Sequence, residues 1–262
     1  MVVVTARRLN RAAFARRLLA EFLGTALLVA VVVGSGIAAQ QLSPNDVGLQ
    51  LLENSMATVF GLAALILMFG PVSGAHFNPV VSLADWFLGR RTGTGMRLRD
   101  VAAYTIVQVA GAIGGAVLAD GMFSVGAHVS TKHRATGGHL LGEVVATVGL
   151  LLLIYALVRT QRAVLAAPAV GAYIGAGYWF TSSTSFPNPA VTIGRMFSDT
   201  FAGIAPASVL PFIGMQLIGL AVAVALILVL YPDAVEHADD VLVPHAASPN
   251  GATSVHTART PA

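Results

Sequence analysis

Two Asn-Pro pairs, each followed by a small apolar residue, carry the plainest chemistry in the sequence. These residues are Asn78, Pro79 and Val80 in the segment SGAHFNPVV, and Asn188, Pro189 and Ala190 in the segment SFPNPAV. Asn is a favoured residue just before a helix, and Pro fits the first helical position because its missing N–H would have no partner there. Each pair therefore predicts a helix start, with an amide group that can donate a hydrogen bond to a passing oxygen.

The apolar stretch after each Asn-Pro pair is too short to cross a bilayer. Each stretch reaches an Arg within about a dozen residues, and a helix of that length spans about 15 Å, half of the hydrocarbon core. We therefore expect two re-entrant half-helices that enter from opposite leaflets and meet at their N-termini near the midplane. Their dipoles would repel a cation but not a neutral hydroxylated solute. Carbonyls of segments 74–76 and 184–187 are expected to accept hydrogen bonds from that solute.

Two acidic residues lie inside apolar segments at matching places. Glu21 stands four residues before Thr25 in AEFLGTALLV, and Glu143 stands four residues before Thr147 in GEVVATVGLL. Intramembrane acids are costly and usually have a task, so we expect both carboxylates to accept hydrogen bonds from the backbones of the re-entrant loops. The alternative is that they are ordinary acidic residues near a helix start.

His76 is expected to be a hydrogen-bonded histidine of the first re-entrant loop. A metal ligand is the alternative, but no second His or carboxylate stands at ligand spacing to it, and the chain has no Cys. The Ser/Thr run 182–185 has no evident base beside it. We therefore expect no metal, no cofactor, no catalytic residue and no enzyme activity.

The overall composition places these residues in a membrane protein. Hydrophobic residues make up 56% and charged residues 10% of the 262 residues, with a mean hydropathy of +0.77, whereas soluble domains carry about 25% charged residues. Six stretches have about the 20 apolar residues that a crossing needs. They cover roughly 18–39, 51–69, 101–119, 142–158, 164–181 and 208–231. The sequence predicts an all-α membrane protein with six transmembrane helices and two half-helices.

Basic residues are distributed unevenly between the two sides of these stretches. The isoelectric point is near 9.7, but most arginines precede the first stretch or lie between the second and third or the fourth and fifth. Only Lys132, Arg134 and Arg195 fall in segments on the opposite side. This bias predicts that both termini are cytoplasmic, and it accounts for the basicity without a nucleic-acid partner.

The two halves of the chain repeat the same order of signals, a Glu-Thr pair followed by an Asn-Pro pair. Three crossings per half is an odd number, so the second half must be inverted, an arrangement typical of transport proteins. We expect a cytoplasmic segment at 1–17, a channel domain at 18–231 and a disordered cytoplasmic tail at 232–262. Within the channel domain the repeats cover about 18–120 and 140–231. The pairs Gly111/Gly115 and Gly171/Gly175 predict close helix crossings.

The motifs SGAHFNPV and FPNPAV, with Glu in the first and fourth stretches, resemble those of the major intrinsic protein family, the aquaporins and aquaglyceroporins. The resemblance runs over roughly residues 14–231. It implies six helices and two half-helices, a pore in each protomer, and a homotetramer in a lipid bilayer. Within the family, the chain most resembles bacterial aquaglyceroporins. This resemblance implies a location in the cell (inner) membrane. Val80 departs mildly from the Asn-Pro-Ala motif of the family.

A second departure concerns the outer constriction of the pore. Family members usually place Arg directly after the second Asn-Pro-Ala, whereas this chain has Val191. Counting from the motifs, the resemblance implies that Thr58, Ala176 and Ser185 complete the constriction. Small or aliphatic residues at all four positions predict a wide opening for small neutral solutes, namely glycerol-like polyols and metalloid hydroxides such as arsenite, with water as a further candidate.

Arg195 stands one helical turn beyond Val191. We expect it to place the missing cation in the outer vestibule, where it attracts oxygen-rich solutes and repels cations; a snorkelling Arg at a helix end is the alternative.

An ion-coupled secondary transporter also uses inverted repeats and broken helices. It would normally need a coupling acid at the midplane, and neither half-helix start provides one.

Overall fold

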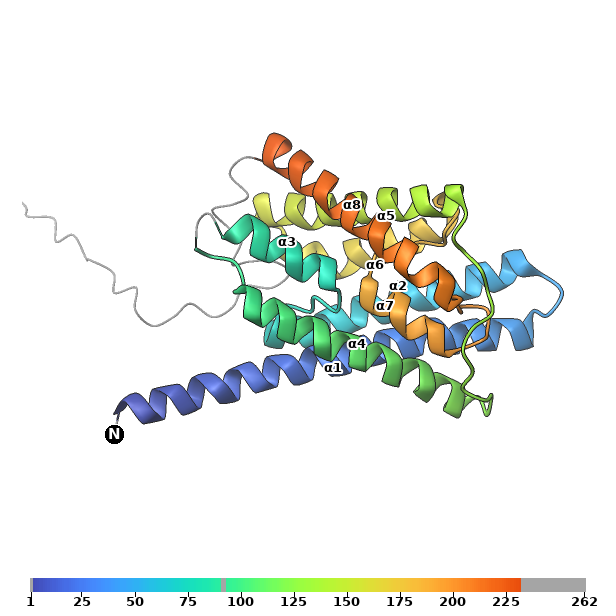
Figure 1. Cartoon of the computed structure of the whole chain (residues 1–262), viewed down its shortest axis with the longest axis horizontal. Helices are drawn as coiled ribbons and strands as arrows, with labels where there is room; N and C mark the ends of the chain where they lie inside the picture. The colour runs from blue at the N-terminus through green and yellow to red at the C-terminus, as the bar shows by residue number, and fades with distance from the viewer. Residues whose placement is uncertain (1, 91–92, 232–262) are drawn as a thin grey trace, which may run out of the picture.

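The computed structural model describes residues 2–90 and 93–231, with side chains from Arg11 onward. In this part of the chain all regular structure is helical (Figure 1). The elements are α1 (Val2–Leu42), α2 (Val47–Ser73), α3 (Pro79–Gly89), α4 (Leu98–Met122), α5 (Gly137–Arg159), the 3₁₀ turn η1 (Ala163–Leu165), α6 (Ala166–Phe180), α7 (Pro189–Gly194), the 3₁₀ turn η2 (Arg195–Phe197) and α8 (Pro206–Leu230). The tail predicted at 232–262 lies outside the described residues.

The expected all-α membrane fold is confirmed. Six helical segments are long and apolar enough to cross a bilayer, and they correspond to α1, α2, α4, α5, η1 with α6, and α8. α3 has 11 residues and α7 has 6, prolonged by η2, so both end well short of a crossing. α1 runs without a break from Val2 to Leu42, so no structural boundary separates the N-terminal segment from the first crossing.

The inverted repeat appears as two sets of helices with the same order, long, long, short and long. The first and last helices of each set pack together, α1 on α4 and α5 on α8. Each short helix also packs against the last helix of the other set, α7 on α4 and α3 on α8. This exchange places α3 and α7 in the middle of the bundle, where they contact each other (Figure 1).

Close helix crossings depend on glycine at the predicted positions. A Cβ added at Gly115 would overlap the carbonyl group of Ala26, and one at Gly111 would overlap the carbonyl oxygen of Phe22. At Gly171 the nearest atom, the carbonyl oxygen of Val59, would be 2.7 Å away. These glycines let α4 lie against α1, and α6 against α2, at backbone-to-backbone distance.

Candidate functional site

The tips of the two half-helices are capped by the predicted Asn residues. Asn78 Oδ1 accepts from the Val80 N–H at 3.0 Å, and Asn188 Oδ1 accepts from the N–H groups of Ala190 and Val191 at 3.0 and 3.2 Å. In both helices Pro follows the cap. The local sequence therefore fixes both where each half-helix starts and which way the Asn amide group points.

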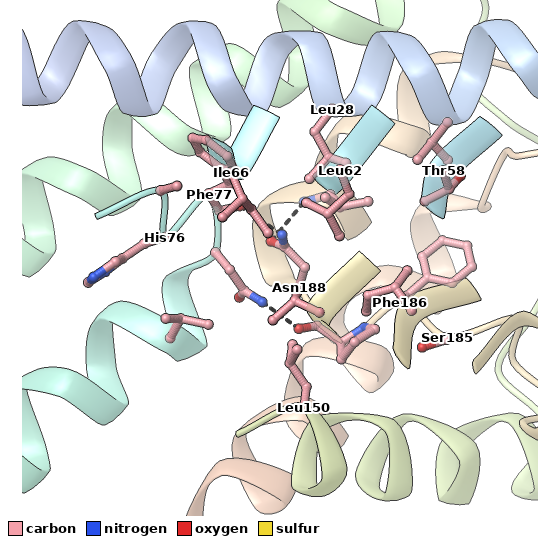
Figure 2. A pocket seen from close by; sticks show the side chains of 18 of the residues that line it. Leu28, Thr58, Leu62, Ile66, His76, Phe77, Leu150, Ser185, Phe186 and Asn188 are labelled. Atoms are coloured by element: carbon pink, nitrogen blue, oxygen red, sulfur yellow. Dashed lines mark hydrogen bonds between the residues drawn. The ribbon is translucent and has the colours of Figure 1, made fainter. Parts of the chain in front are cut away.

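Those amide groups join the two tips to each other. Asn78 Nδ2 donates to the carbonyl oxygen of Pro187 at 2.7 Å, and Asn188 Nδ2 donates to that of Phe77 at 2.7 Å. Figure 2 shows both bonds as dashed lines in the centre of the cavity. The sequence predicted that the amides serve a solute, but one N–H of each is already used across the interface. Each amide has a second N–H, and both Asn side chains line the cavity.

Glu21 holds the first re-entrant loop. Its carboxylate accepts from the N–H groups of His76 and Phe77 at 3.0 and 2.7 Å, and from the Ser73 hydroxyl at 2.6 Å. Gln108 Nε2 donates to it at 2.8 Å. Glu21 is fully buried, so these donors replace the water that a carboxylate would otherwise bind.

Glu143 holds the second loop in the equivalent way. It accepts from the Phe186 N–H at 2.8 Å and from Gln216 Nε2 at 2.7 Å, and it is also fully buried. The sequence analysis missed Gln108 and Gln216. A signal was present, because α4 and α8, the last long helices of the two repeats, each contain a single Gln.

The loops themselves run in left-handed backbone conformations that non-glycine residues rarely adopt. Positive φ occurs at Ala75 and Phe77 in the first loop, at 49° each, and at Thr184 and Ser185 in the second, at 63° and 56°. Such conformations cost of order 1–3 kcal/mol each and persist only when the surroundings hold them. The carboxylates of the two buried glutamates provide that support.

His76 is placed as expected for a loop histidine. Its Nδ1 lies 2.9 Å from the Ser82 hydroxyl, and its ring lies edge-on to Tyr104 with centroids 5.6 Å apart. His76 also lines the cavity. Among the described residues no group of three or more His, Cys, Asp or Glu side chains could hold a metal ion.

A cavity of about 70 Å³ runs past both tips. A single water needs about 10–15 Å³ on the same measure, so the cavity has room for several small molecules of that size. Its wall is apolar where α1, α2, α5 and α6 face it, for instance at Leu28, Ile66 and Leu150 (Figure 2). The two loops and the two Asn caps contribute polar groups to the same lining.

Three of the four predicted constriction residues line this cavity: Thr58, Ser185 and Val191. The prediction for Ala176 is wrong, because its side chain is exposed on the outer face of α6. Tyr178 lines the cavity instead. Residues i and i+2 of a helix point about 200° apart. Counting back from the Asn-Pro motif therefore selected a residue on the opposite face of α6.

Tyr178 changes the character of the opening. Its hydroxyl lies 3.0 Å from the Thr58 hydroxyl, so an aromatic hydroxyl stands where the sequence predicted a methyl group. The nearby Ser185 hydroxyl is buried and has no hydrogen-bond partner among the described residues. The lining at this point therefore carries an aromatic ring and a further hydroxyl that the sequence analysis did not predict.

The sequence analysis placed Arg195 in the outer vestibule, and in the structure its side chain is buried in the wall of the cavity. It is 3% exposed and lines the cavity. Its guanidinium carbon lies 3.3 Å from the centroid of the Phe186 ring, and its Nε donates to the carbonyl oxygen of Ala202. The buried, stacked position excludes a snorkelling Arg and keeps the cation beside the path.

A second guanidinium reaches the same aromatic ring from the segment between α4 and α5. The Arg134 guanidinium carbon lies 5.3 Å from the Phe186 ring, and its nitrogens donate to the carbonyl oxygens of Gly203 and Phe201 at 2.7 and 3.0 Å. Burial lowers the pKa of Arg134 from its ordinary value, yet an arginine stays cationic at neutral pH. The sequence analysis missed the contact of Arg134 with Phe186, because only the tertiary fold brings the two residues together.

Comparison with known proteins places this site in a described family. The model of the family called major intrinsic protein matches residues 8–187. The chain is 49% identical over 213 residues to aquaglyceroporin AqpS of Rhizobium meliloti (strain 1021), covering 80% of this chain and 88% of that protein. It is 32% identical over 216 residues to aquaporin AqpM of Methanothermobacter marburgensis, covering 72% and 85%.

A solved structure shows the same fold. The X-ray structure of the aquaglyceroporin from Plasmodium falciparum superposes with a TM-score of 0.59, covering 84% of this chain and 98% of that chain. The sequence identity is 22%, so this likeness concerns the architecture of the helices and half-helices.

Proposed function

This chain belongs to the major intrinsic protein family, and we propose that its pore conducts glycerol-like polyols and metalloid hydroxides such as arsenite. Members of this family are passive channels for water, glycerol and other small solutes. The chain is a multi-pass membrane channel and not an enzyme. The observation that carries the proposal is the pair of reciprocal bonds between the Asn-capped tips, because it sets a polar gap beside an apolar wall.

The two-sided lining suits a polyol. A glycerol-like solute can turn its hydroxyls toward the loops and the second N–H groups of Asn78 and Asn188, and its carbon chain toward Leu28 and Leu150. Metalloid hydroxides are also neutral and carry several hydroxyls, so the same polar edge serves them. The aquaglyceroporin named above as a relative supports this class of solute.

Cations are rejected by two features of the pore. The N-termini of α3 and α7 meet at the gap and present the positive ends of two helix dipoles. Arg195 adds a full charge beside Val191, at the outer end. In this proposal Arg195 takes over the electrostatic task of the Arg that family members usually place directly after the second Asn-Pro-Ala, without occupying the constriction.

An ion-coupled transporter is not supported. The two intramembrane acids, Glu21 and Glu143, are fully buried and accept hydrogen bonds from the loops, and no acidic side chain of the described residues lines the cavity.

We further propose that both termini are cytoplasmic in the inner membrane, in keeping with the arginine distribution, and that the protomers assemble as a homotetramer, in keeping with the family.

Light scattering by proteoliposomes tests the function. Glycerol and trivalent arsenic hydroxide are expected to enter vesicles that contain the protein faster than empty vesicles, without saturation and without change when a proton uncoupler is added. Saturable uptake that disappears with the uncoupler would favour the transporter, and rates equal to those of empty vesicles would contradict a channel. Urea and water complete the comparison.

A further inference from the structure

A second recess, separate from the pore, lies between the first part of α1 and the start of α4. It is a crevice of about 880 Å³, and among the described residues its lining includes four arginines, Arg11, Arg17, Arg97 and Arg99, and one acidic residue, Asp100. Figure 1 shows α1 extending beyond the bundle next to the beginning of α4. The crevice therefore opens where two crossing helices leave the apolar part of the molecule.

The single acid does not neutralise this group of arginines. Asp100 lies 3.4 Å from Arg99, whose side chain is 73% exposed, and such a surface pair contributes little. Arg17 is half-buried and hydrogen-bonded at 2.9 Å to the neutral hydroxyl of Tyr104. The described lining of the crevice thus keeps a net positive charge, which favours a negatively charged partner.

The lining is apolar as well as cationic. Phe14 and Leu18 belong to the same crevice, on the side where α1 continues into its apolar span. Guanidinium groups bind phosphate oxygens in a bidentate manner, and basic pockets between helix ends bind anionic headgroups. We propose that the crevice binds an anionic phospholipid, with its phosphate between the arginines of α1 and α4 and its acyl chains beside Phe14 and Leu18.

The bound headgroup would sit next to the support of the first pore loop. Arg17 donates to Tyr104, and the Tyr104 hydroxyl donates to the carbonyl oxygen of Ser73 at 3.0 Å. The Ser73 hydroxyl in turn donates to Glu21, which holds the loop. The side chains of Arg17 and Tyr104 thus connect an anion at Arg17 to Ser73, the last residue of α2 before the pore loop. This site does not depend on which solute the pore conducts.

Native mass spectrometry of the full chain tests the site with phosphatidylglycerol and phosphatidylcholine of identical acyl chains. Phosphatidylglycerol is expected to bind more tightly, and R97Q/R99Q is expected to weaken it by about tenfold or more, given the contribution of each cationic side chain near an anionic lipid. R11Q/R99Q, which keeps Arg97 before α4, should weaken it to a similar degree. R16Q/R162Q removes two exposed arginines outside the crevice and should bind as the unmodified chain does.

Inorganic phosphate and glycerophosphoglycerol distinguish a lipid site from a phosphate site. Neither is expected to displace the lipid at millimolar concentration, because neither fills the apolar side of the crevice. Displacement by inorganic phosphate, equal binding of phosphatidylcholine, or unchanged binding by both crevice variants would each overturn the proposal. A circular dichroism spectrum and a melting temperature equal to those of the unmodified chain establish that a variant with weak lipid binding is folded.

Discussion

At the scale of residues, the proposed selectivity depends on the side chains that line the cavity near Val191. Thr58, Tyr178, Ser185 and Val191 supply three hydroxyls and one aliphatic group around the opening, and Arg195 stands beside them. Val191 leaves open the space that a long cationic side chain would fill. In the proposed function this combination admits hydroxylated solutes larger than water, and the Arg195 charge stands beside their path.

Replacing Val191 by Arg tests the size of the opening. A long side chain in a cavity of about 70 Å³ should obstruct glycerol and lower its flux by at least about tenfold, which corresponds to about 1.4 kcal/mol of added barrier. Water should be less affected because it is smaller. A176R is the matched control, since Ala176 is exposed on the outer face of α6, and it should leave glycerol flux unchanged. Undiminished glycerol flux in V191R would contradict the assignment.

Replacing Arg195 by Gln tests its electrostatic role. A unit charge about 6 Å from a cation, at an effective dielectric constant of about 20, repels it by about 3 kcal/mol. Loss of that charge should raise cation leak on the order of tenfold or more, while glycerol flux is retained. Vesicle conductance and glycerol flux are measured on the same preparation. If neither changes, Arg195 serves only to brace Phe186.

At the scale of elements, the channel depends on two short helices that are stabilised from outside themselves. A helix as short as α7 is marginal on its own, and its loop carries left-handed residues. Asn caps, cross-tip bonds and the buried glutamates supply what the isolated segments lack. Asn78 and Asn188 therefore stabilise the tips and also line the cavity beside them.

Substitutions of Asn188 separate its two contributions. N188A removes a helix cap and a bond across the tips, so the free energy of unfolding should fall by about 2–3 kcal/mol. N188S keeps a capping hydroxyl and loses only the amide bond to Phe77, so its loss should be about 1 kcal/mol smaller. Chemical unfolding in detergent measures both values. Equal stability of N188A and the unmodified chain would show that the tips are held elsewhere.

Neighbouring glycines of α4 give a matched test of the α1–α4 crossing. In G115A the new methyl group overlaps the backbone of Ala26, and we expect a loss of about 1–3 kcal/mol. In G114A nothing lies within 4 Å of the new Cβ, so stability should be equal or up to about 1 kcal/mol higher. Thermal unfolding of the two variants side by side measures the difference. Similar melting temperatures would mean that the crossing is adaptable.

For the whole molecule, the sequence was sufficient to predict the architecture because each of its determinants is local. Hydrophobic length defines the crossings, and Asn-Pro followed by a short apolar stretch defines a half-helix. The repeated Glu defines the inverted order. Each of these signals can be read along the chain without tertiary information.

The lining of the opening could not be predicted in full, for a physical reason. Which face of α6 points inward depends on how the helix packs against α2, so a count along the chain chose Ala176 instead of Tyr178. Arg134 and Arg195 are brought to Phe186 only when the segment before α5 folds over η2. Gln108 and Gln216 bond to glutamates more than 70 residues away. Contacts of this kind are properties of the assembled bundle.

The central claim is that neutral solutes pass along the cavity beside the two Asn-capped tips. Val81 lines the cavity in the first turn of α3 and is 2% exposed, so a Trp there fills the gap while the outer opening stays intact. The decisive measurement is glycerol flux into proteoliposomes that contain the unmodified chain or V81W, with ionic current recorded in parallel. We predict rapid flux without current in the unmodified chain and flux at the level of empty vesicles in V81W. Equal flux in the two would place the path elsewhere and contradict the account.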